Sequence, residues 1–298
     1  MTHIPVLLNE VIRLTDPREG EFVIDGTAGG GGHAEAFARK IGKRGRLLCL
    51  DWDAEALAAT RAAFEEKKIG LRTDFAHANY AALPEVIERE ECGKADVVLL
   101  DLGFSSRQID DPARGFSFRS ERAPLDMRYD AGGGGLTAAE EVNRLSESAL
   151  ADIFRRYGEE RNARAAAKAI VAARRKERIV TVGDLIRALA PAFSPARRKG
   201  RVHFATKVFQ ALRIHVNREF ENLESFLGSL PRVVRPGGRV AIITFHSLED
   251  RIVKRAFRSL VAEHAATAVT KKPVAPGREE RERNPRSRSA KLRVVQFQ

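Results

Sequence analysis

Residues 21–38 read Glu-Phe-Val-Ile-Asp-Gly-Thr-Ala-Gly-Gly-Gly-Gly-His-Ala-Glu-Ala-Phe-Ala, and this stretch decides the fold. The apolar run 22–24 predicts a short buried strand that ends at Asp25, and a helix-like segment begins at His33. Glycines suit a backbone that turns at positive φ or lies close to a ligand. The N–H groups at the start of the following helix point to the same place. The pattern therefore predicts a cofactor-binding loop at the carboxyl end of a parallel strand.

Strand-like and helix-like segments alternate over the first hundred residues. Strands are expected at 22–25, 46–51, 71–75 and 96–101, with helices at 33–41, 54–68 and 80–91 between them. This alternation is typical of βαβ units and a parallel sheet. Three of the strands end in an acid, namely Asp25, Asp51 and Asp101. Since ligands bind at the carboxyl ends of such strands, we expect these acids to cluster at one edge of the sheet.

The strand pattern stops after residue 103 and returns after residue 200. A polar segment with a glycine run at 132–135 leads into predicted helices, which start at Thr137 (capping box with Glu140), 145–157, 161–176 and 181–190. One long amphipathic helix is then expected over 204–227, followed by strands at 239–245 and 291–297. We predict a discontinuous α/β domain, residues 1–105 and 201–298, with an inserted helical domain at 106–200.

Composition places the chain among reduced, non-membrane proteins. It has 298 residues, 43% of them hydrophobic, and two cysteines, Cys49 and Cys92, that lie far apart. This favours a cytoplasmic protein without disulfides. No apolar run approaches the roughly 20 residues of a membrane span, and the N-terminal segment does not resemble a signal peptide. No cluster of metal-ligand residues is visible, so we expect no metal.

Net charge points to a polyanionic partner. The formal charge is +12, and residues 271–298 hold nine lysines and arginines against three acids. A second basic cluster occupies residues 197–201. Each run alone is explained by a solvated tail or loop. Together they favour RNA, although charge alone leaves DNA open.

The glycine loop alone fits both a nicotinamide-dependent oxidoreductase and a methyltransferase. Asp51, about twenty residues after the loop, suits ribose hydroxyls in either case. The segment Asp101-Leu-Gly-Phe-Ser-Ser106 favours methylation of an exocyclic base amine, since it places an acid, small residues and an aromatic just after a strand. The lone pair of such an amine is delocalised into the ring. The site must therefore accept hydrogen bonds from the amine and hold it in line with a methyl sulfonium.

Motifs along nearly the whole chain resemble the bacterial small-subunit ribosomal RNA (cytosine-N4)-methyltransferases of the MraW or RsmH type. The matching segments are 3–11, 25–33, 101–106 with Gln108, 114–118, 124–128, 209–217, 235–238, 245–251 and 284–293.

The resemblance implies a Rossmann-like sheet that binds S-adenosylmethionine, with the inserted helical domain recognising the substrate. It implies transfer of a methyl group to the N4 amine of a decoding-centre (P-site) cytidine of 16S rRNA in the small ribosomal subunit. It also assigns cofactor contacts, in which Asp51 holds the ribose and Tyr80, often Phe in the family, stacks on the adenine. The remaining contacts that it implies come from Gly31, Gly32, His33, Asp101 and Gln108.

Asp126 and Ser105 are the candidate acceptors for the target amine and are named here as catalytic. The alternative for Asp126 is a pair with Arg128 or Arg122 that only shapes the pocket. Asp51 and Asp101 have alternative roles as caps, and His246 either lines the pocket or caps a helix. A non-catalytic assembly factor that binds S-adenosylmethionine is an alternative to an enzyme, and both monomer and homodimer stay open.

Overall fold

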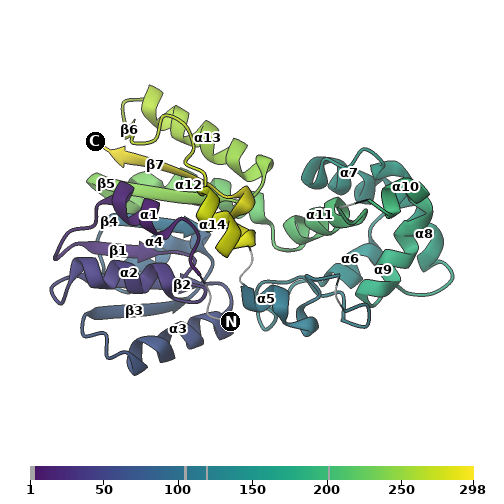
Figure 1. The fold of residues 1–298 in the computed structure, drawn as a ribbon, viewed down its shortest axis with the longest axis horizontal. Coiled ribbons are helices and arrows are strands. Elements are labelled where there is room, and N and C mark those ends of the chain that lie inside the picture. The colour runs from purple at the N-terminus through teal and green to yellow at the C-terminus, as the bar shows by residue number, and fades with distance from the viewer. Residues whose placement is uncertain (1–3, 104–105, 119, 201) are drawn as a thin grey trace. The chain divides into compact units, whose positions relative to one another are not determined.

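The computed structural model describes residues 4–103, 106–118, 120–200 and 202–298. The chain forms two compact units, the first from Met1–Gly103 with Phe220–Gln298 and the second from Phe104–Glu219 (Figure 1). The first unit is interrupted by the second, but the later boundary falls at Glu219 and not after residue 200 as predicted. The reason is that α11 (Thr206–Val216) packs on α7 (Glu147–Gly158) inside the helical unit.

A seven-stranded sheet forms the centre of the first unit, in the order β3-β2-β1-β4-β5-β7-β6. The strands from β3 to β5 are parallel, whereas β7 is antiparallel to both of its neighbours. The strand order reverses between β1 and β4, and ligands bind at such a switch point. The strands are β1 (Phe22–Asp25), β2 (Arg46–Asp51), β3 (Arg72–His77), β4 (Ala95–Asp101), β5 (Val234–Thr244), β6 (Ala266–Ala268) and β7 (Lys291–Phe297).

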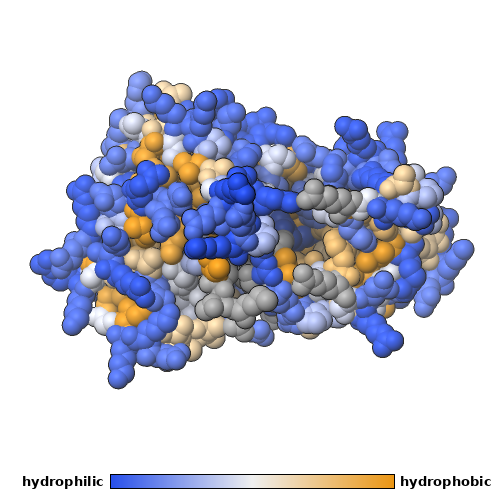
Figure 2. All heavy atoms as spheres, viewed as in Figure 1, coloured by the Kyte–Doolittle hydropathy of each residue, from blue (hydrophilic) through white to orange (hydrophobic). Residues whose placement is uncertain are grey.

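Helices cover both faces of this sheet, because successive strand side chains point to opposite faces. In β4, Val98 and Leu100 belong to one core cluster and Val97 and Leu99 to the other. The first cluster is completed by α4 (Leu83–Arg89), α12 (Glu219–Val233) and α13 (Ser247–Ala262). The second is completed by α1 (Leu8–Thr15), α2 (Gly32–Ile41) and α3 (Ala54–Glu66). Hydrophilic residues dominate the visible surface (Figure 2).

The basic C-terminal segment is built into the fold. It contains α14 (Arg278–Arg283), a 3-10 turn at Pro285–Ser289 and β7, whose Leu292 and Val294 are fully buried. The Arg293 guanidinium donates to Asp250 at 2.7 and 3.2 Å, and Lys291 donates to it at 3.3 Å. Burial pushes the pKa of Asp250 upward, but these two cations outweigh burial and lower it. Lys291 and Arg293, two of the cations in this segment, are therefore paired within the protein.

The second unit is helical and has its own apolar core. Two predicted helix starts are confirmed, since Thr137 with Glu140 and Thr181 with Asp184 both form capping boxes. Besides α7 and α11, the helices are α5 (Ser106–Asp110), α6 (Ala138–Arg144), α8 (Ala163–Arg174), α9 (Val182–Leu189) and α10 (Pro195–Arg198), with 3-10 turns at Pro112–Arg114 and Ala190–Ala192.

The single helix predicted over 204–227 is wrong, because the chain breaks between α11 and α12. The Asn217 side chain donates to the carbonyl of Met127 at 2.7 Å and accepts from the backbone N–H of Tyr129 at 2.7 Å. The next residue, Arg218, has φ +49 and cannot continue a right-handed helix. Among the described residues, none of the helices combines the length and apolar character that crossing a membrane requires.

Candidate active site

The three strand-end acids Asp25, Asp51 and Asp101 lie at the carboxyl edge of the sheet, as predicted. The glycine loop is tied to this edge by backbone hydrogen bonds. Gly26 donates to Leu99 of β4 at 2.9 Å, and Ala28 donates to Leu50 of β2 at 2.7 Å. The loop therefore spans the switch point between β1 and β4.

Two glycines are required where the loop enters α2. Gly31 has φ +77, a conformation that side chains rarely adopt. A Cβ on Gly32 would lie only 2.3 Å from Cγ of Pro5, so the N-terminal segment closes over this turn. The Thr60 hydroxyl donates to the carbonyl of Gly29 at 2.9 Å and fixes the other side of the loop. The open backbone at Gly31 and Gly32 is thus held from two directions.

Asp51 is held in place by backbone donors. One carboxylate oxygen accepts from Gly29 at 2.7 Å and the other from Asp53 at 2.8 Å. Burial is the main cause that raises the pKa of Asp51 to about 6, and these two bonds oppose it. The cap of α3 is instead Asp53, which accepts from Glu55 and Ala56. The alternative reading of Asp51 as the cap of this helix is therefore wrong.

Asp25 and Asp101 each have one buried carboxylate oxygen that lacks a hydrogen-bond partner among the described residues. Thr27 links them, because its N–H donates to Asp25 at 3.2 Å and its hydroxyl accepts from the N–H of Asp101 at 2.6 Å. Burial raises the pKa of Asp25 to about 7. Burial and then the charges of Asp25 and Glu249 raise the pKa of Asp101 well above its ordinary value.

His33 is buried and is therefore not a surface residue. Its Nε2 donates to the carbonyl of Val6 at 3.0 Å, which leaves Nδ1 3.9 Å from Oδ2 of Asp101. The imidazole therefore lies between the N-terminal segment and the acid at the end of β4.

Tyr80 lies beside the loop. A Cβ built on Gly26 would be 3.6 Å from Cβ of Tyr80. The Tyr80 ring packs edge-on against Phe226, with centroids 5.8 Å apart. Tyr80 begins the 3-10 turn (Tyr80–Ala82) that follows β3. Two residues before it, the N–H of Ala78 donates to the carbonyl of Asp51 at 3.1 Å. The ring and the Asp51 carboxylate are thus positioned by adjacent backbone.

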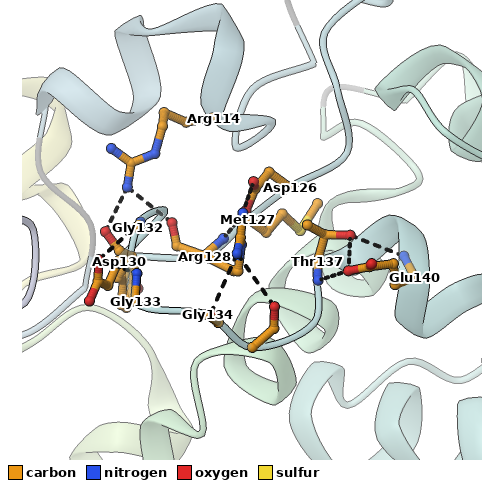
Figure 3. Close-up of polar contacts among 12 residues, drawn as sticks. Arg114, Asp126, Met127, Arg128, Asp130, Gly132, Gly133, Gly134, Thr137 and Glu140 are labelled. Carbon is orange, nitrogen blue, oxygen red and sulfur yellow. Dashed lines mark hydrogen bonds and ion pairs between the residues drawn. The ribbon is translucent and has the colours of Figure 1, made fainter.

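Gln108 and Asp126 belong to the second unit, and Ser105 lies outside the described residues. Gln108 is buried in α5. Figure 3 shows that Asp126 points to Arg128, whose Nε and Nη2 each donate to one carboxylate oxygen at 2.8 Å. Burial alone raises the pKa of Asp126, but the hydrogen bonds and charge of Arg128 outweigh burial and lower it. The ion pair between Asp126 and Arg128, which is the alternative role of Asp126, is therefore present.

The backbone around Asp126 is strained and tightly held. Met127 has φ +66, and its N–H donates to the carbonyl of Arg114 at 3.0 Å. Nη2 of Arg114 donates to the carbonyls of Arg128 and Tyr129 at 3.0 and 2.6 Å (Figure 3). Strain of this kind persists where surroundings enforce it, and it is common at functional sites.

His246 caps a helix, which was one of its two readings. Its Nδ1 accepts from the N–H of Glu249, and the Glu249 carboxylate accepts in turn from the N–H groups of Phe245 and His246. Sequence reasoning did not assign Thr27, Thr60 or Asp25 to the site. Only the position of Asp25 at the end of the first strand gave a signal for it.

A comparison with protein-family models identifies the family of this protein. The model for the MraW methylase family matches residues 1–298. The chain belongs to that family. Three similar relatives of the family are each named ribosomal RNA small subunit methyltransferase H.

These relatives match the chain along nearly all of its length. The protein of Syntrophobacter fumaroxidans is 43% identical over 316 residues, which cover 100% of this chain and 97% of that protein. The Elusimicrobium minutum protein is 45% identical, covering 99% and 98%. The protein of a Synechococcus species is 47% identical, covering 98% and 91%.

An MraW methylase is a methyltransferase, and S-adenosylmethionine is its methyl donor. The carboxyl edge of the sheet fits that molecule. The donor carries positive charge on its sulfonium and its α-ammonium group, and two buried carboxylates here have an oxygen that no other residue described by the structure contacts by a hydrogen bond.

Proposed function

We propose that this protein transfers a methyl group from S-adenosylmethionine to the exocyclic N4 amine of a decoding-centre (P-site) cytidine of 16S rRNA. The substrate is the small ribosomal subunit, and the reaction takes place in the cytoplasm. Membership in the MraW family and the names of the relatives support the choice of small-subunit rRNA. The observation that carries the proposal is the pair of unpartnered carboxylate oxygens at the sheet edge, because they favour a cationic donor over a dinucleotide.

Within this proposal, different residues contact different parts of the donor. Asp51 accepts from the ribose hydroxyls, since each of its oxygens is used by one backbone donor and keeps a lone pair. Tyr80 stacks on the adenine. Gly31, Gly32 and His33 line the amino-acid end, and Asp101 with Gln108 completes the far side.

Asp126 is proposed as the acceptor for the target amine, with Ser105 as a second candidate. When bound, the donor supplies an electrophilic methyl group on a sulfonium sulfur. A carboxylate that accepts a hydrogen bond from the amine localises the nitrogen lone pair and orients it. The bidentate contact with Arg128 keeps Asp126 ionised and in one rotamer, and the proton that the amine loses passes to water.

The direct test uses small subunits from a strain that lacks this protein. They are incubated with the purified protein and labelled S-adenosylmethionine, and the rRNA is digested for nucleoside mass spectrometry. N4-methylcytidine is the expected product. If the donor binds but no methylated cytidine forms, the protein is an assembly factor and the proposal is wrong.

A pair of variants separates donor binding from turnover. Asp51→Ala is expected to abolish donor binding. Asp126→Ala is expected to keep the donor affinity and lose turnover. Arg122→Ala is the matched control, because Arg122 is the other arginine considered as a partner of Asp126, and it is exposed and forms no side-chain hydrogen bond or ion pair within the described part of the chain. Normal turnover by Asp126→Ala would remove Asp126 from the acceptor role.

A further inference from the structure

Helix α8 of the second unit carries cations on one side and no acid at all. Residues 161–176 contain six lysines and arginines and neither Asp nor Glu. Ala163, Ala166, Ala167 and Ile170 are buried against the unit's core. Away from the core, α8 exposes Arg164 and Lys168, and Arg161 and Arg175 are exposed just before and just after the helix; we call these four cations the α8 basic stripe.

The stripe is aligned along the helix. At 100° per residue, Arg164, Lys168 and Arg175 fall within about 40° of one another and span about 16 Å. Only alanines, Ala165 and Ala172, are exposed close to this line. A polyanion can therefore approach the helix surface closely along the whole stripe.

None of the four cations has a hydrogen-bond or ion-pair partner within the described part of the chain. This differs from the two basic segments that stand out in the sequence. In the C-terminal segment, Arg278 pairs with Glu282 and Arg283 with Glu279. In the cluster at 197–201, Arg197 donates to the buried Glu160. Single cations without such a partner also occur in these two segments, for example Lys271 and Arg198, but in the stripe all four cations lack one within the described residues.

The stripe also costs the helix stability. Arg164 lies in the first turn of α8, where a cation opposes the helix dipole. Arg164 and Lys168 are like charges four residues apart, which repel each other. A local arrangement that breaks two stabilising rules is expected at functional positions.

We propose that the α8 basic stripe binds the phosphate backbone of the rRNA substrate and positions the small subunit on this enzyme. The inference rests on the proposed function for the choice of RNA. The alanines between these cations add no hydrogen-bonding groups, and contacts from arginine or lysine to phosphates carry no sequence information. The stripe therefore supplies affinity and orientation, and base selection stays with the active site.

The test compares two triple variants of the full-length protein. The first is R164Q/K168Q/R175Q, in which glutamine keeps the helix propensity. The matched control is R44Q/R89Q/R232Q, which removes the same charge at exposed arginines that each pair with a glutamate in the first unit. Binding to small subunits and to protein-free 16S rRNA is measured between 50 and 200 mM salt. Circular dichroism verifies that both variants fold.

Losing three phosphate contacts is expected to reduce the slope of log K against log salt by about two to three units. The KM for subunits rises, while kcat and the Kd of S-adenosylmethionine stay unchanged. The variant R164K/R175K keeps the slope, because a phosphate contact requires only the positive charge.

Three results would overturn the proposal. The slope stays unchanged in the stripe variant, the control variant lowers it equally, or the loss occurs with subunits but not with protein-free rRNA. The last result would identify an acidic protein as the partner. Because these readouts measure binding, they stand even where the wild-type protein forms no N4-methylcytidine, an outcome that contradicts only the proposed function.

Discussion

Replacing Asp51 by asparagine separates the fold from donor binding, because two effects on stability nearly cancel. The amide offers one oxygen where the carboxylate uses two, so the N–H of Gly29 or Asp53 loses its acceptor at a cost of about 1–3 kcal/mol. Burial raises the pKa of Asp51 from 3.8 to about 6. Above pH 7 the wild type carries this unfavourable ionised group and the asparagine variant does not, so the substitution stabilises the folded state by roughly 3 kcal/mol. We expect the free energy of unfolding of Asp51→Asn to stay near that of the wild type.

Donor binding has no such compensation. A charge-assisted hydrogen bond is worth about 1.5–3 kcal/mol, so the Kd of S-adenosylmethionine is expected to rise about 10- to 150-fold. Isothermal titration calorimetry at pH 7.5 measures this value, and thermal unfolding verifies the fold. Asp53→Asn is the control, because asparagine caps α3 as well as aspartate does. If Asp51→Asn binds the donor as tightly as the wild type, Asp51 does not hold the ribose.

Three further predictions concern stability. The pKa of Asp25 is raised by burial from its ordinary value of 3.8 to about 7 in the folded protein, so the folded state loses stability as pH rises between these values. Without donor, the free energy of unfolding of Asp25→Asn, measured by urea titration, is expected to increase relative to that of the wild type as pH rises from 4 to 8. The expected change is on the order of 4 kcal/mol. Gly32→Ala places a Cβ against Pro5 and is expected to cost about 1–3 kcal/mol, whereas Gly228→Ala, in open space on α12, gains up to about 1 kcal/mol in thermal unfolding. Deleting residues 291–298 removes β7 and is expected to abolish cooperative unfolding, and a sharp transition in the truncated chain would contradict the buried position of this strand.

The parts of the site that were predictable from sequence are those where local pattern and tertiary position agree. β1, β2 and β4 are buried on both faces, so each is a continuous apolar run, and each ends in an aspartate that marks the carboxyl edge. The glycine loop was predictable for the same reason, since its backbone conformation excludes most side chains.

The parts that sequence reasoning missed depend on distant partners. Hydrophobic periodicity continues from Val216 to Phe220, so the break at Asn217 is set by hydrogen bonds to Met127 and Tyr129, about ninety residues earlier in the chain. A strand was expected only at 239–245, but β5 begins at Val234, and residues 236–238 lie within it where the pairing with β4 is irregular. The N-terminal helix α1 was also missed, because it is short and begins without a side-chain cap.

The insertion of the helical unit into the chain sets an order for folding on the ribosome. Residues 104–219 are contiguous and bury their own core, so this unit can fold once it has left the exit tunnel. The sheet cannot close at that time, because β4 pairs with β5 and β7 lies between β5 and β6. At ordinary synthesis rates, the roughly 80 residues that follow Glu219 take on the order of ten seconds. During this interval β4, whose sequence is largely apolar, lacks its partner strand β5 and is accessible to chaperones.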